Sequence, residues 1–244
     1  MHHFIVMHFF FLYISLKPTH NVMKKLITML AILSASFTAA QEIDLGVKGG
    51  LTIAADMISP GDQYKSRPLP GYYGGVFVAV PIQDKISVQL EGSYVEGKGV
   101  FRREYTLGPA TINGKSNAVL KYINVPLLLK YNVTEKTAIQ LGGFYNFVLG
   151  VSAIQSADVK QTSNGMPIPS KSFTNRETDL NHEHKTEFYG ILAGVEHKLN
   201  DDLKLELRYS YGLGDFGTDA FKAKHENQKY TPASIQLGIA YSLF

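Results

Sequence analysis

The sequence predicts an all-β fold, an eight-stranded antiparallel up-and-down transmembrane β-barrel with short periplasmic turns and long extracellular loops. Three observations lead to this prediction. Apolar and polar side chains alternate with a period of two, the connections between these segments are short and long in turn, and an export leader precedes them. A mean hydropathy of -0.05 excludes a bundle of membrane helices, so any crossing of a membrane must be made by strands.

The beginning of the chain has the composition of an export leader, because it lacks acidic side chains. Met23 is followed by two lysines, an apolar stretch and the small residues 38–40, which is the order of a cleavable signal peptide. The apolar stretch is shorter than the roughly 20 residues that span a bilayer. We therefore expect residues 1–40 to be a leader with its true start at Met23, and residues 41–244 to form the barrel domain.

Charge and cysteine content exclude several classes of function. The leader holds three of the 24 basic residues, so the mature chain has 21 basic and 21 acidic side chains and is formally neutral. This balance gives no support to nucleic-acid binding. The absence of cysteine excludes a disulfide framework, a thiolate metal site and a lipid anchor on cysteine. We expect no cofactor.

Eight segments show the alternation expected of half-buried strands. In one of them leucine and tyrosine occupy every second position, and Lys204, Glu206 and Arg208 lie between them. The segments are Ile43–Ala55, Gly71–Pro81, Lys85–Glu96, Val119–Tyr131, Thr137–Val151, Thr186–Leu199, Leu203–Leu213 and Tyr230–Phe244.

The connections between these segments alternate in length. Short polar turns are predicted at Ile82-Gln83-Asp84, Asn132–Lys136 and Asn200-Asp201-Asp202. Long polar loops are predicted at Asp56–Pro70, Gly97–Ala118, Ser152–Lys185 and Gly214–Lys229. This alternation is typical of a membrane barrel, with turns at the periplasmic end and loops outside the cell.

Two kinds of barrel fit eight alternating strands, and they differ in which face meets water. A soluble lipocalin-like carrier has its apolar face inside, whereas a membrane barrel has it outside. Tyrosines near strand ends and the terminal Phe244 favour the membrane barrel, whose insertion requires the barrel assembly machinery. In that case opposite charges must pair inside a plugged narrow lumen. The predicted lumen charge network is Glu91, Lys130, Glu196, Lys204, Glu206 and Arg208.

Four stretches of sequence carry a resemblance to a known family. They are Gly46-Val47-Lys48-Gly49-Gly50, Leu120–Tyr131, Gly142-Gly143-Phe144-Tyr145 and Leu207–Asp215. The second includes Pro126 within a strand, where proline is unusual. On these residues the chain resembles the PorT-like outer-membrane β-barrel proteins, the outer membrane protein beta-barrel domain family. The resemblance implies the fold and an outer-membrane location, and it implies no catalytic residues.

Two histidines are the only weak candidates for a metal site. His182 and His184 would share a face in an extended chain, with carboxylates nearby, and could hold a divalent cation. Ser172, His182 and Asp179 could likewise form a catalytic trio, but no nucleophile elbow surrounds a serine. The alternative to both hypotheses is a solvated loop, so we assign no catalytic residue and no metal ligand.

The sequence therefore predicts a non-enzymatic outer-membrane barrel whose extracellular loops act in surface binding or in envelope and secretion support. Expected partners are outer-membrane lipid or lipopolysaccharide, whose phosphates basic loop residues can contact, and a surface protein or ligand. The basic loop residues are Arg102, Arg103, Lys222, Lys224 and His225. The alternatives are an outer-membrane hydrolase or acyltransferase with a rim active site, and a soluble lipocalin-like carrier.

Overall fold

The computed structural model describes residues 43–54, 57–58, 64–107, 110–163, 166–224 and 230–243. The predicted leader and Phe244 lie outside the described residues. Cleavage of the leader and a true start at Met23 therefore stay predictions.

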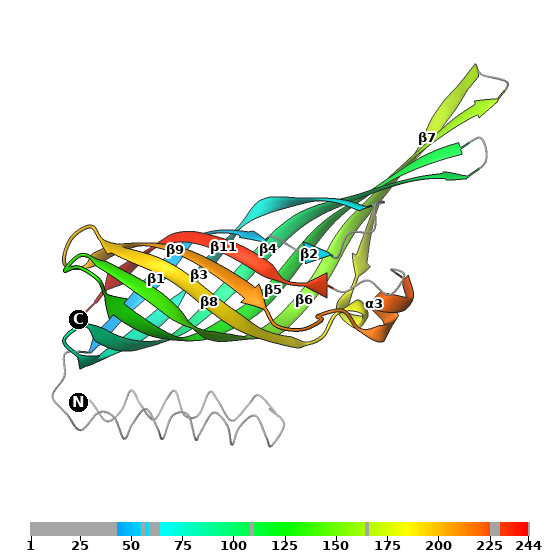
Figure 1. Cartoon of the computed structure of the whole chain (residues 1–244). Coiled ribbons are helices and arrows are strands. Elements are labelled where there is room, and N and C mark those ends of the chain that lie inside the picture. Colours follow the sequence, from blue (N-terminus) through cyan, green and yellow to red (C-terminus); the bar gives the residue numbers. More distant parts are fainter. Residues whose placement is uncertain are drawn as a thin grey trace, which may run out of the picture. The chain divides into compact units, whose positions relative to one another are not determined.

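Eight antiparallel strands close into a ring, which confirms the predicted fold class (Figure 1). Their order around the ring is β5-β4-β3-β1-β11-β9-β8-β6, and β6 pairs back with β5. Each strand lies beside its neighbours in the sequence, so the topology is up-and-down. The strands are β1 (Asp44–Ala54), β3 (Tyr64–Gln83), β4 (Ile86–Leu107), β5 (Ala110–Asn132), β6 (Thr137–Ser163), β8 (Glu187–Lys198), β9 (Leu203–Gly212) and β11 (Ala233–Ser242).

The remaining elements gather at the end of the barrel opposite the short turns, which we call the outer end (Figure 1). Strand β7 (Met166–Asp179) pairs with β6 outside the ring, and β2 (Met57–Ile58) pairs with β10 (Tyr230–Thr231). A short 3-10 helix, η2 (Asn181–Glu183), and α3 (Asp219–Lys224) complete the fold. Within the described ranges, no helix has both the length and the apolar character needed to cross a membrane.

The second and third long connections are long as predicted, but they are mostly strand and not irregular loop. β4 continues to Leu107 and β5 begins at Ala110, whereas β6 continues to Ser163 and β7 covers Met166–Asp179. Both faces of such extensions can meet water. Apolar and polar side chains therefore do not alternate along them, and the sequence contains no pattern from which a strand could be predicted. Figure 1 shows these strands running beyond the ring.

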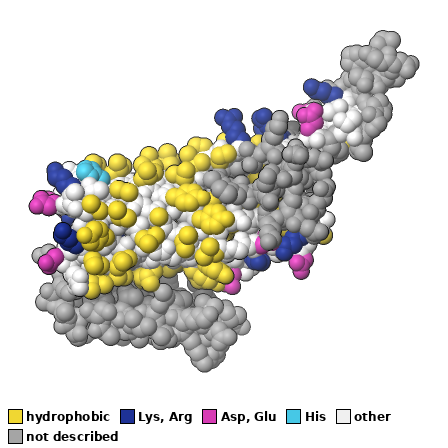
Figure 2. All heavy atoms as spheres, in the orientation of Figure 1, with side chains coloured by type: hydrophobic (Ala, Val, Ile, Leu, Met, Phe, Trp, Pro, Cys, Tyr) yellow, Lys and Arg dark blue, Asp and Glu magenta, His cyan; other side chains and the backbone are white. Residues whose placement is uncertain are grey.

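Apolar side chains of the ring point outward. On β8, Ile191 and Val195 are 53% and 44% exposed, whereas Leu192 between them is 2% exposed and points into the lumen. Figure 2 shows the outward side chains as a hydrophobic band with charges at either end. This is the polarity of a membrane barrel and the inverse of that of a soluble lipocalin-like carrier.

Glycine at position 46 makes room for an aromatic ring in the lumen. Gly46 on β1 lies opposite Phe77 on β3, whose side chain is 2% exposed. A Cβ atom at Gly46 would overlap with the Phe77 ring and with the carbonyl oxygen of Tyr241. The packing of the narrow lumen therefore depends on the missing side chain at this position.

We expect Gly46→Ala to lower the free energy of unfolding by about 1–3 kcal/mol, because neither the ring nor the strand backbone can move freely. Urea unfolding of the barrel in lipid vesicles measures this loss. Gly74→Ala is the matched control, since among the described residues its Cβ atom would meet no neighbour closer than Lys48 O at 3.9 Å. Equal losses for the two variants would contradict this account.

Candidate functional site

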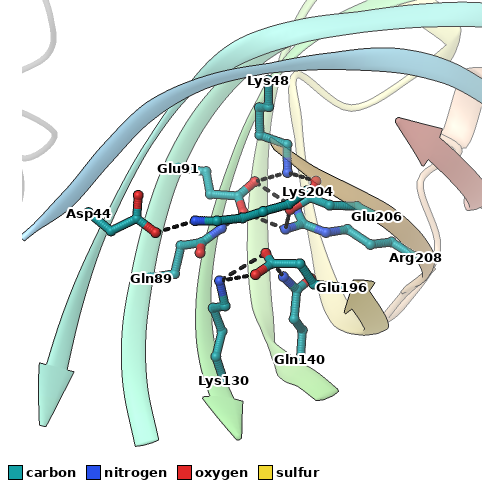
Figure 3. Close-up of polar contacts among 10 residues, drawn as sticks. All are labelled: Asp44, Lys48, Gln89, Glu91, Lys130, Gln140, Glu196, Lys204, Glu206 and Arg208. Atoms are coloured by element: carbon teal, nitrogen blue, oxygen red, sulfur yellow. Dashed lines mark hydrogen bonds and ion pairs between the residues drawn. The ribbon is translucent and has the colours of Figure 1, made fainter. Parts of the chain in front are cut away.

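The half of the lumen near the short turns is crossed by a quartet of buried charges (Figure 3). The Arg208 guanidinium donates to both oxygens of Glu91, at 2.7 and 2.8 Å, and to Glu206 at 2.7 Å. Lys48 Nζ lies 3.0 Å from Glu91 Oε2 and 2.6 Å from Glu206 Oε2. All four side chains are 1–2% exposed, so each charge is neutralised by the others and not by bulk water.

Two further ion pairs lie beside the quartet. Lys130 Nζ donates to both oxygens of Glu196, at 2.7 and 2.8 Å, and Gln140 donates to the same carboxylate at 2.9 Å. Lys204 pairs with Asp44. The quartet and these two pairs contain four cations and four carboxylates, and hence no net charge. We call these eight residues the charge plug.

The structure brings the predicted lumen charges together and adds two residues to them. Lys130 contacts Glu196 and does not join the Glu91 carboxylate. Lys48 and Asp44 of β1 were not predicted to belong to the network. The alternation of β1 contained the signal for Lys48, because exposed Leu45, Val47 and Leu51 set the outward phase of that strand.

A cavity of about 200 Å³ lies between the charge plug and the outer end, and we call it the outer chamber. One wall, from β5, β6 and β8, is mainly aromatic and aliphatic. It includes Tyr122, Phe144, Phe188 and Leu192. The facing wall, from β1, β9 and β11, is polar and includes Thr52, Ser210, Ser234 and Gln236. The sequence predicts a lumen filled by its own side chains, and this chamber was not anticipated.

A chain of rings connects the aromatic wall to the connections at the outer end. Phe188 lies with its ring centroid 4.8 Å from that of Phe216, which lies 5.6 Å from Tyr230. His184 contacts Phe216 and Phe221 with centroid distances of 5.3 and 5.7 Å. We call His184, Phe216, Phe221 and Tyr230 the aromatic cap.

Backbone hydrogen bonds hold the aromatic cap in place. Phe216 O accepts from Lys185 N at 3.0 Å, and Phe216 N donates to Tyr230 O at 2.8 Å. Asp215 accepts from the backbone N–H groups of Gly217 and Tyr230. Burial raises the pKa of the Asp215 carboxyl, but these two bonds and Lys222 outweigh burial, so its pKa lies below the ordinary value.

The two predicted candidate histidines lie in different environments. Residues 181–183 form η2 and are not extended, so the shared face that prompted the metal hypothesis is not formed. The His182 side chain is 68% exposed, whereas His184 belongs to the aromatic cap, and its Nδ1–H donates to Leu180 O at 3.1 Å. Among the described residues, no cluster of three or more His, Asp or Glu could hold a metal ion.

The described residues of the suggested catalytic trio likewise do not form a recognisable site. Asp179 accepts from the backbone N–H of Asn181 at 2.8 Å, which gives its carboxylate a role in the turn before η2. The side chain of Ser172 lies outside the described residues.

Comparison with known proteins identifies a family. Residues 38–217, about three quarters of the chain, match the family described as the outer membrane protein beta-barrel domain. No curated protein matches the chain.

Several solved structures are similar to this chain at low sequence identity. Neisserial surface protein A is 14% identical, with a TM-score of 0.42 and coverage of 83% of this chain and 100% of that one. Ail of Yersinia pestis, solved with the heparin analogue sucrose octasulfate, is 15% identical, with a TM-score of 0.40 and coverage of 83% and 99%. OprG of Pseudomonas aeruginosa is 15% identical, with a TM-score of 0.40 and coverage of 83% and 97%.

We expect Arg208→Leu to destabilise the barrel by about 3–5 kcal/mol, because it leaves two buried carboxylates with Lys48 alone. The urea midpoint in lipid vesicles reports this loss. Lys198→Leu removes an exposed cation from the neighbouring strand and should change stability by less than about 0.5 kcal/mol. A loss below about 1 kcal/mol for Arg208→Leu would mean that water reaches the plug.

The aromatic cap should loosen in acid. Burial lowers the pKa of the His184 imidazole below its ordinary value of 6.5. Because the folded cap binds fewer protons than the opened one, its stability is complete above pH 6.5 and falls as the pH drops below that value. The protection factors of the Phe216 and Phe221 amides, which correct hydrogen-exchange rates for the intrinsic effect of pH, should therefore fall between pH 7.5 and pH 5.

His184→Gln should abolish this dependence on pH, whereas His182→Gln should preserve it, because the His182 side chain is exposed. A pH response that survives His184→Gln would assign the titration to another group.

Proposed function

This chain belongs to the outer membrane protein beta-barrel domain family, and we propose that it is a non-enzymatic outer-membrane barrel that binds lipopolysaccharide and acts at the cell surface. The charge plug supports a role at the surface rather than bulk passage of solutes, because it fills half of a lumen that is already narrow. Within the described residues, neither histidine at the outer end belongs to a cluster of metal ligands.

The length of the strands supports a role outside the membrane. β6 has 27 residues and β8 has 12. A bilayer is crossed by about 11 residues of a tilted strand. About 16 residues of β6 therefore lie beyond the membrane, a length of roughly 50 Å at ~3.3 Å per residue.

The observation that carries the lipopolysaccharide proposal is a pair of cations on the outward face of this extension. Arg102 on β4 lies directly opposite Lys115 on β5, and both are exposed. Like charges opposite each other in a sheet are unfavourable unless an anion lies between them. Within the described part of the chain, neither side chain has an ion-pair partner.

The position of this cation pair fits the phosphates of lipopolysaccharide. Glu96 and Lys121 lie opposite each other and are the first charged residues on the outward face beyond the hydrophobic band. Arg102 and Lys115 follow six residues further along the same strands. Residues 97–118 and 152–179 together hold seven basic and four acidic side chains, so the extension as a whole attracts anions.

Family membership also supports the route by which the protein reaches its location. We infer export by the signal peptide in residues 1–40 and insertion by the barrel assembly machinery. The narrower PorT-like assignment is supported by the segment 120–131, which lies on β5 with Pro126 buried in the lumen.

We expect the double variant Arg102→Ser with Lys115→Ser to bind purified lipopolysaccharide about fivefold to thirtyfold more weakly, since two charge contacts at ~0.5–1 kcal/mol each are lost. Binding is measured with the barrel in phosphatidylcholine nanodiscs at two salt concentrations, and the difference should shrink at high salt.

Lys136→Ser with Lys198→Ser is the matched control, because it removes the same charge from exposed positions near the short turns. A shortened variant replaces 103–114 and 156–175 by Asn-Gly turns, closing Arg102 to Lys115 and Gln155 to Arg176. It should still fold and bind lipopolysaccharide. If the matched control weakens binding as much as the double variant, the cation pair is not the site.

A further inference from the structure

We propose that the outer chamber is a binding site for a small, uncharged, mainly apolar molecule that carries one hydrogen-bonding group. A one-ring or two-ring aromatic alcohol is the chemical class that fits its walls. The inference is independent of the proposed binding of lipopolysaccharide, because the outer chamber lies inside the ring and the cation pair lies on its outward face.

The size of the outer chamber is sufficient for such a ligand. An apolar cavity of ~150 Å³ inside a protein can admit a benzene molecule. The outer chamber measures about 200 Å³. Its aromatic wall is rigid, because Phe188 packs edge-to-face against Tyr122 and Phe144 with centroid distances of 5.5 and 6.2 Å. Edge-to-face and offset contacts of this kind are the ones that a further aromatic ring would make.

The polar wall has an unused hydrogen-bonding group. The side chain of Thr52 is buried, with 1% of the residue exposed, and its Oγ1 has no hydrogen-bond partner among the described residues. Thr52 lies opposite Gln236 in the β1–β11 register, and both line the outer chamber. A buried hydroxyl without a partner costs free energy. A ligand hydroxyl beside Thr52 would remove this cost.

A second polar contact is available on the aromatic wall itself. Asn124 donates to Asn146 at 2.6 Å, and both side chains line the outer chamber. Each amide retains donors or acceptors beyond this single bond. The aromatic wall and these amides together give the combination that ligand sites usually have, an apolar surface with a few fixed polar groups.

The ionisable side chains that line the outer chamber offer little charge that could pair with an ionic ligand. Lys98 lies 3.0 Å from Glu96 and is paired with it. Glu183 is buried and has a partner of its own. His184 is held neutral by burial. A charged ligand would lose its hydration without gaining a counter-ion, so the outer chamber should select against it.

The location of the outer chamber determines how a ligand would reach it. The charge plug closes the lumen on one side, and the aromatic cap lies on the other. A ligand must therefore come and go at the outer end, past Phe216, Phe221 and Tyr230. The site retains or senses its ligand and does not conduct it toward the short turns.

The test uses equilibrium dialysis of 1-naphthol against the full-length mature barrel in phosphatidylcholine nanodiscs, with empty nanodiscs as background. We expect saturable uptake of about one molecule per barrel. Ser234→Phe fills the outer chamber from β11, where Ser234 is 7% exposed and has the same inward phase as Gln236, and should lower the affinity at least tenfold. Ala193→Phe adds the same ring to the outward face of β8 and should leave binding unchanged.

Ligand selectivity distinguishes the outer chamber from general partition into lipid. Naphthalene should bind more weakly than 1-naphthol, and 1-naphthalenesulfonate should not bind. The double variant Asn124→Leu with Asn146→Leu, or Thr52→Val, should reduce the preference for 1-naphthol over naphthalene several-fold. Each variant must retain the heat-modifiable migration of a folded barrel.

The proposal is overturned if Ser234→Phe and Ala193→Phe bind 1-naphthol equally, or if the sulfonate binds as tightly as the alcohol. Its failure is separable from that of lipopolysaccharide binding. Arg102→Ser with Lys115→Ser should leave uptake of 1-naphthol unchanged, and Ser234→Phe should leave lipopolysaccharide binding unchanged.

Discussion

Neutralisation of charge inside a narrow ring is the constraint on which the other features depend. Four cations and four carboxylates share the lumen near the short turns, each within contact of an opposite charge. Burying any one of them alone would cost several kcal/mol. The charged residues are tolerated because cations and carboxylates on β1, β4, β5, β8 and β9 pair with one another. The outward face can then be almost wholly apolar, and the outer chamber begins where the ion pairs end.

Much of this arrangement could be predicted from alternation alone, because each strand of the ring meets lipid on one face and a polar lumen on the other. The inward phase of Glu206 and Arg208 is evident from the leucines and tyrosines between which they lie. Pairing was less predictable, since it depends on the stagger between strands. The alternation of side chains along β1 places Lys48 on the lumen face. Its partners Glu91 and Glu206, however, are 43 and more than 150 residues away in the sequence.

The outer half of the molecule was harder to predict for two physical reasons. Strand extensions with water on both faces have no apolar phase, so 97–107, 110–118, 152–163 and 166–179 resemble loops in sequence although they form β-structure. Inward aromatic residues such as Tyr73 and Phe144 belong to the same apolar class as outward ones, which hides the change from a charged to an aromatic lumen. A cavity, moreover, is a property of side chains from several strands and has no signature in any one of them.

The arrangement of the charge plug has a consequence for the order of events in biogenesis. Lys48 lies on β1 and its partner Glu206 on β9, and the strand between them in the ring is β11, the last of the eight ring strands in sequence order. These charges cannot meet until β11 has paired with β1 along their nine-residue seam. Until then these charges can keep their hydration shells, because water can still enter the open ring. Seam closure and dehydration of the plug thus form one cooperative step, which would make the finished barrel slow to reopen.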